Sequence, residues 1–125
     1  MGTVPAREFM DGVVHYLVGE LSLATPSITL GTLPAGATIL KPASGAYVNV
    51  AFNAGTNNHI DIGTTADKDF YATDLAGGSI AFVLLDEAVT QKVAADTTIV
   101  ADYAQSGTAA TTGSAVIVIA YVLSN

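Results

Sequence analysis

The stretch AYVNVAFNAGTNNHIDIG, residues 46–63, contains two segments in which apolar and polar side chains alternate. Successive side chains of a β-strand point to opposite faces, so strict alternation predicts a strand with one buried face. In the first segment Val48, Val50 and Phe52 are predicted to point inward, and the residues between them outward. This part of the chain therefore predicts β-structure and argues against a helix.

The second segment follows the same rule. Ile60 and Ile62 are predicted to point inward, and His59 and Asp61 outward. The predicted strands are AYVNVAF (46–52) and NHIDIG (58–63), and the residues between them, NAGTN (53–57), include the glycine and asparagine that turns favour. Two strands joined by a turn are therefore expected here, and the polar character of the region is explained by the turn.

The rest of the chain has the same character, with Val, Ile and Thr abundant and Gly, Pro, Asn and Asp at short intervals. The further predicted strands are VVHYLV (13–18), SITLGTL (27–33), ATILK (37–41), SIAFVLL (79–85), a weaker AVTQKV (88–93), TTIVADYA (97–104) and SAVIVIAYVLS (114–124). Eight or nine short strands at this spacing predict an all-β antiparallel β-sandwich or barrel. One helical turn is expected at 67–78, with Asp67 as its N-cap and Gly77 as its stop.

The last predicted strand, 114–124, is apolar on both faces. In an antiparallel sandwich this pattern predicts a central strand, or one whose outer face is buried by another subunit. Only 12% of the residues are charged and 50% are hydrophobic. A low surface charge favours a surface that is covered by copies of the chain or by a partner, and the alternative is a neutral surface rich in Thr, Ser and Ala.

The charge balance excludes two classes of partner. The chain carries eleven acidic and only four basic residues, for a net charge of −7. Nucleic-acid and anionic-membrane binding both depend on Lys and Arg, so neither partner is expected. The longest apolar run, AVIVIAYVL (115–123), is less than half of the ~20 residues that span a bilayer. The first residues lack the basic-then-apolar pattern of a signal peptide.

Residues for catalysis are scarce. There is no cysteine, and the two histidines, His15 and His59, lie in no recognisable motif. His15 is expected to be structural within a strand, and His59 to lie on an exposed strand face. Nucleophilic catalysis needs a nucleophile, a base and an orienting group together, and the sequence offers no such set. We therefore predict that the protein is not an enzyme and has no catalytic residues.

Four acids lie close together in sequence: Asp61, Asp67, Asp69 and Asp74. Carboxylates bind hard cations such as Ca²⁺, but the EF-hand spacing is absent and Lys68 lies between two of the acids. The alternative is that Asp67 and Asp69 are turn and capping residues whose short side chains hydrogen-bond their own backbone. We predict the turn role, with no metal and no cofactor, and the sequence leaves cation binding open.

One segment resembles a known family. Across TLPAGATILKPASGAYVNVAFNAGTNNHIDIGTTADKDFYAT (32–73), the order of turns and strands resembles small all-β virion proteins of tailed bacteriophages. The matching elements are Pro34-Ala35-Gly36, Ala37–Leu40, Tyr47–Asn53, Gly55-Thr56, Ile60–Gly63 and Asp67–Ala72, followed by TTIVADY (97–103) and TTGSAVIVIAYVL (111–123). The resemblance implies a jelly-roll-like sandwich that decorates or cements the outer surface of a phage capsid. It implies a homotrimer, a major capsid protein as partner, and no catalytic residues.

This interpretation divides the chain into a domain and an N-terminal arm. Residues 13–125 are expected to form the β-sandwich, and residues 1–12 an N-terminal arm. Arg7, Phe9 and Met10 in this arm are the predicted capsid contacts, and the alternative is a frayed terminus.

The alternative function is a glycan- or receptor-binding module of a head fibre or tail. Loops at one end of a sandwich serve this role in other proteins. Phe70 and Tyr71 are the aromatic residues that favour it, and the lack of Trp argues against it.

Overall fold

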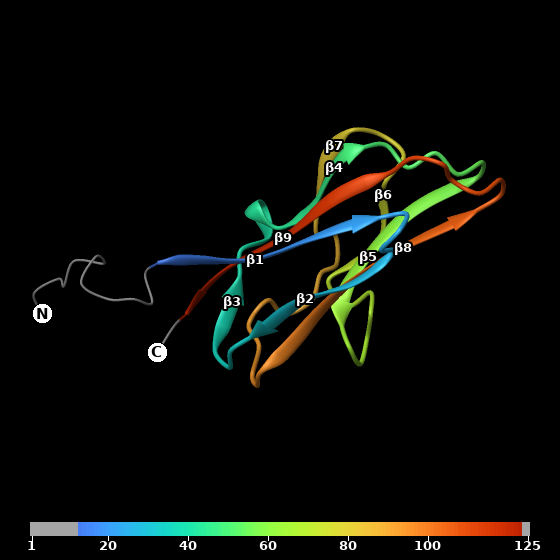
Figure 1. The fold of residues 1–125 in the computed structure, drawn as a ribbon. Coiled ribbons are helices and arrows are strands. Elements are labelled where there is room, and N and C mark those ends of the chain that lie inside the picture. Colours follow the sequence, from blue (N-terminus) through green and yellow to red (C-terminus); the bar gives the residue numbers. More distant parts are fainter. Residues whose placement is uncertain (1–12, 124–125) are drawn as a thin grey trace, which may run out of the picture.

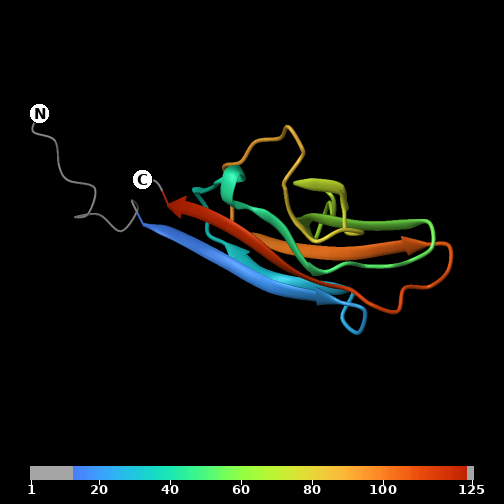
Figure 2. The same ribbon diagram turned by 90° about the horizontal axis from the view of Figure 1, so that it is seen from above.

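The computed structural model describes residues 13–123, which form two packed β-sheets (Figures 1 and 2). The described residues contain nine strands, one turn of 3-10 helix at Lys41–Ala43, and no α-helix. All the paired strands are antiparallel. The predicted all-β antiparallel β-sandwich is confirmed. None of the described residues belongs to a helix that could span a bilayer.

The first sheet is organised around its long central strand, β9, and is called the β9 sheet below. Its strands are, in order, β1 (Val14–Ser22), β9 (Ser114–Leu123), β4 (Gly45–Val50) and β7 (Ala81–Leu84), with β3 (Ala37–Ile39) paired to the end of β9. β1 pairs with β9 from Val14 opposite Val122 to Ser22 opposite Ser114. Of the two alternatives that the sequence left for the last strand, the structure shows the central position.

The second sheet is built around β8 and β5, and is called the β8 sheet below. Its strands are, in order, β2 (Ser27–Leu33), β8 (Thr97–Ser106), β5 (Asn57–Thr64) and β6 (Ala72–Ala76). β2 has the same bounds as the predicted strand, and β5 and β8 extend the predicted ones by one to two residues.

The core lies between the two sheets and comes from the inward-pointing positions of both. Ile60 and Ile62 on β5 and Ile117 and Ile119 on β9 are fully buried, as strand alternation requires. Phe52, just after β4, is the largest fully buried side chain. The predicted inward positions of Val48, Phe52, Ile60 and Ile62 are confirmed.

Val50 is an exception to the predicted alternation. It was expected to point inward with Val48 and Phe52, but its exposed fraction is 47%. The pairing of β4 with β9 shifts by one residue between Val48 and Val50. A β-bulge of this kind reverses the direction of the following side chain, and a pattern of residue types does not reveal it.

The helical turn expected at 67–78 is wrong. Thr64 and Asp67 close a tight turn, in which the Thr64 N–H donates to the Asp67 carbonyl at 2.8 Å and Thr64 Oγ1 accepts from the Asp67 N–H at 3.0 Å. The chain then enters β6, where Leu75 pairs with Ile60 of β5. Asp67 is therefore a turn residue and not a helix N-cap, because pairing with β5 overrides the local capping signal.

The weak strand expected at 88–93 is also wrong. Thr38 and Lys92 form only an isolated bridge. At the two ends of β3, the Ile39 N–H donates to the Gln91 carbonyl at 2.8 Å and the Val93 N–H donates to the Ala37 carbonyl at 2.9 Å. β3 has three residues, so it offers too short an edge for a strand to extend along it.

Candidate functional site

The two histidines lie in different sheets. His15 is on β1 of the β9 sheet and stacks on Tyr121, with ring centroids 5.4 Å apart. His59 is on β5 of the β8 sheet, with Nδ1 3.5 Å from Asp74 Oδ1. The structure therefore does not bring the two imidazoles together as an acid–base pair.

Of the four aspartates named above, Asp61 on β5 and Asp74 on β6 link two neighbouring strands, and Asp67 lies in the turn that Thr64 closes. Asp61 Oδ1 accepts a hydrogen bond from the Asp74 backbone N–H at 2.7 Å. Asp74 has a φ of 55°, in the left-handed region that Asp tolerates better than most residues. Among residues 13–123, no three His, Cys, Asp or Glu side chains gather closely enough to hold a metal ion.

The pKa of Asp61 is raised above the ordinary value of an aspartate. Partial burial is the main cause, and the negative charges of Asp74, Asp69 and Asp102 add to it, while the hydrogen bond from Asp74 N–H opposes it. A carboxyl group with a raised pKa binds its proton more tightly in the folded state than in the unfolded chain. The ionised form therefore costs stability, and the cost appears as the pH rises from about 4 through the folded-state pKa.

We expect Asp61→Asn to stabilise the protein at pH 7, because the amide removes the charge and keeps the oxygen that accepts from Asp74 N–H. The gain should be small, about 0.5 kcal/mol, as is usual for partly exposed positions. Thermal unfolding of both proteins at pH 7 and pH 3 measures it. The difference should vanish at pH 3, where Asp61 is protonated. A constant difference at both pH values would contradict this explanation.

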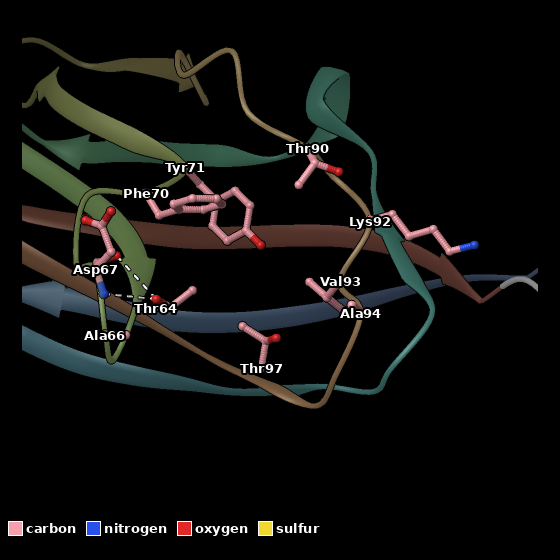
Figure 3. Close-up of a pocket in the computed structure, with 10 residues that line it drawn as sticks. All are labelled: Thr64, Ala66, Asp67, Phe70, Tyr71, Thr90, Lys92, Val93, Ala94 and Thr97. Atoms are coloured by element: carbon pink, nitrogen blue, oxygen red, sulfur yellow. Dashed lines mark hydrogen bonds between the residues drawn. The ribbon is translucent and has the colours of Figure 1, made fainter.

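An open pocket of about 400 Å³ lies between the 64–71 loop and the 90–97 segment (Figure 3). Its lining residues are Thr64, Ala66, Asp67, Phe70, Tyr71, Thr90, Lys92, Val93, Ala94 and Thr97. In Figure 3 the Lys92 side chain extends away from the aromatic rings. The lining is mainly apolar and offers no pairing of nucleophile and base.

Phe70 and Tyr71 do not form a sugar-stacking platform. Their rings meet edge to face, with centroids 4.9 Å apart and planes at 88°. Tyr71 is buried, and burial raises the pKa of its phenol. Phe70 packs against the core. Because sugars stack on exposed, flat aromatic faces, this arrangement weighs against the glycan-binding alternative.

The clearest candidate for a functional surface is the outer face of the β9 sheet. Its outward-pointing apolar side chains, called the apolar face below, are Val14, Tyr16, Val18, Tyr47, Phe82, Leu84, Val116 and Val118. Tyr16, Val18 and Tyr47 have exposed fractions of 59%, 57% and 51%. Scattered exposed apolar residues are normal, but a contiguous apolar patch marks an interaction surface.

Strand register makes the apolar face continuous across four strands. Val18 of β1 lies opposite Val118 of β9, which lies opposite Gly45 of β4, and Gly45 lies opposite Leu84 of β7. In the neighbouring row, the exposed Glu20 of β1 lies opposite Val116 of β9, Val116 opposite Tyr47, and Tyr47 opposite Phe82, so this row is apolar on three of its four strands.

The rings of Tyr47 and Phe82 stack with centroids 5.6 Å apart. From the sequence alone, only the last strand was recognised as part of the apolar face. The alternating residues of the predicted strand at 13–18 and the outward Tyr47 were the sequence features that could have pointed to more of it.

Charged residues are distributed unequally between the two sheets. Glu20 is the single charged residue on the five strands of the β9 sheet. The strands of the β8 sheet carry Asp61, Asp74 and Asp102, and no Lys or Arg. The sandwich therefore has one nearly uncharged sheet and one acidic sheet.

Comparison with known proteins shows the class of fold. No family model matches the chain, and no curated protein matches it. A solved structure, a chain of the "Cyanophage Pam1 capsid asymmetric unit", is similar with a TM-score of 0.65 and 15% sequence identity. The match covers 89% of this chain and 85% of that chain. At this identity the likeness shows a shared β-sandwich fold.

The predicted capsid contacts Arg7, Phe9 and Met10, and the proposed arm 1–12, lie outside the described residues. Their role stays a prediction.

Proposed function

We propose that this chain is a structural protein of a tailed-phage virion, a decoration or cement protein on the outer surface of the capsid. The observation that carries the proposal is the likeness of fold, over nearly the whole of both chains, to a chain of a cyanophage capsid assembly. The sequence resemblance to small phage virion proteins supports the same role.

We infer that the sandwich is a jelly roll. With the short β3 set aside, the eight remaining strands pair in a nested order. β1 pairs with β9, β2 with β8, β4 with β7, and β5 with β6. A long hairpin folded over into two four-stranded sheets gives this order, and jelly rolls have two such sheets.

The proposed mechanism is adhesion without chemistry. The protein forms a homotrimer and bridges neighbouring subunits of the major capsid protein, which is its proposed partner. Stable interfaces bury about 1,000 Å² or more, and the exposed apolar side chains of the β9 sheet supply contact area of the right kind. The acidic β8 sheet favours solubility when copies are crowded on a shell.

The alternative is a head-fibre or tail module that binds a glycan or receptor. Copy number per particle separates the two functions, because a decoration protein follows the capsid lattice and is abundant, whereas a fibre or tail component is present in a handful of copies. Binding to a sugar array would favour the alternative.

A further inference from the structure

We propose that the apolar face of the β9 sheet binds a second copy of this chain. The inference rests on the proposed function only in that it names the surface through which the proposed oligomer forms. The proposal names a second copy of the chain as the partner that covers the apolar face.

The first support is the amount of apolar surface. Aromatic side chains of the size of Tyr16, Tyr47 and Phe82 present about 150–250 Å² each when fully exposed. At their observed exposures, and with the five aliphatic residues of the face added, the total is on the order of 600 Å². Each partner in a standard interface contributes about 800 Å², so this face supplies most of one such patch.

The second support is charge. The chain has a net charge of −7, so two copies repel each other unless uncharged surfaces meet. The strands of the β9 sheet carry one charge, Glu20, whereas those of the β8 sheet carry Asp61, Asp74 and Asp102. Copies related by a symmetry axis bury matching patches around it, and this sheet is where they can approach with least repulsion.

The third support comes from the composition of the face. Tyr and Phe are enriched in the cores of protein interfaces, and charged residues are depleted there. Tyr47 and Phe82 stack on each other on the outer surface, where Tyr47 is 51% and Phe82 39% exposed. A pre-formed aromatic pair on β4 and edge strand β7 suits an interface anchor, because little side-chain freedom remains to be lost on association.

The test is the oligomeric state of the full chain and of two matched variants, measured by sedimentation equilibrium. Val18→Glu places a charge on the apolar face, on the outward side of edge strand β1. Thr29→Glu is the control, because it places the same charge at an exposed position of β2, the edge strand of the other sheet. Circular dichroism checks that each variant is folded, and Tyr16→Ser, a change at an exposed position, replaces Val18→Glu if that variant does not fold.

We expect the wild type and Thr29→Glu to sediment at the same whole-number multiple of the monomer mass. Val18→Glu should associate at least tenfold more weakly, since burying an unpaired carboxylate is costly. Added salt should strengthen wild-type association by screening the acidic surfaces. A wild type that stays monomeric, or a Val18→Glu protein that associates like the wild type, would overturn the inference.

The outcomes also separate this inference from the proposed function. Association that Val18→Glu weakens, in a protein absent from virions, would support the inference and contradict the decoration role. A protein that is monomeric in solution but abundant in virions would support the decoration role and contradict the inference. If Val18→Glu keeps the oligomer but no longer binds phage shells, the apolar face is a shell contact and the inference is wrong.

Discussion

Replacing Phe52 by Ala should destabilise the protein by about 3–5 kcal/mol, the usual cost of removing a buried aromatic ring. Phe52 is 1% exposed, and its ring stacks on that of Tyr103 with centroids 4.0 Å apart. The ring packs so closely against Gly113 that a Cβ added there would overlap it. Domains are stable by only about 5–15 kcal/mol, so the loss would be a large fraction of the total.

Chemical denaturation of the wild type and the Phe52→Ala variant measures this loss. Phe70→Ala is the matched control, because Phe70 is only partly buried and packs at the margin of the core. Its loss should be near 1–2 kcal/mol, since burial of a partly exposed side chain stabilises less. Equal losses for the two variants would contradict the assignment of Phe52 to the centre of the core.

Asn58→Ala should be the second most damaging substitution, with a loss of about 2–3 kcal/mol. Asn58 Oδ1 accepts hydrogen bonds from the Ala54 N–H at 2.8 Å and from the Tyr103 hydroxyl at 2.6 Å. Its Nδ2 donates to the Ala54 carbonyl at 3.1 Å. Removing the amide leaves these largely covered groups without partners, and each unsatisfied buried group costs about 1–3 kcal/mol.

The control for this prediction is the adjacent residue. Asn57 is exposed and its Nδ2 donates to Ser106 Oγ at 2.8 Å. Because water can replace that bond, Asn57→Ala should cost under about 1 kcal/mol. Thermal unfolding of the two single variants compares them directly. A loss for Asn57→Ala as large as that for Asn58→Ala would show that the 54–58 turn is stabilised in another way.

The strands could be predicted where apolar and polar residues alternate in the sequence and the apolar ones are buried in the structure. Ile60 and Ile62 on β5 show period two in the sequence, and both are buried. β6 was missed because Ala72–Ala76 is a short segment that follows a helix-like capping signal at Asp67. Its conformation is determined by pairing with β5, a contact that local residue preferences do not encode.

The candidate site was predictable only in part. The last strand was recognised as apolar on both faces, and Ser114–Leu123 is indeed central in its sheet. The apolar face also depends on Tyr16 from β1 and Phe82 from β7, which come together through strand order. Strand order arises from the nested pairing of distant segments, so a linear pattern of residue types does not reveal which outward side chains become neighbours.

The number of copies of this chain per virion tests the central claim most directly. Virions are purified on a gradient, and the band of this protein is compared with that of the major capsid protein by gel densitometry. The proposed decoration role predicts many copies, in a simple ratio that follows the capsid lattice. Absence of the chain from purified particles would contradict the account.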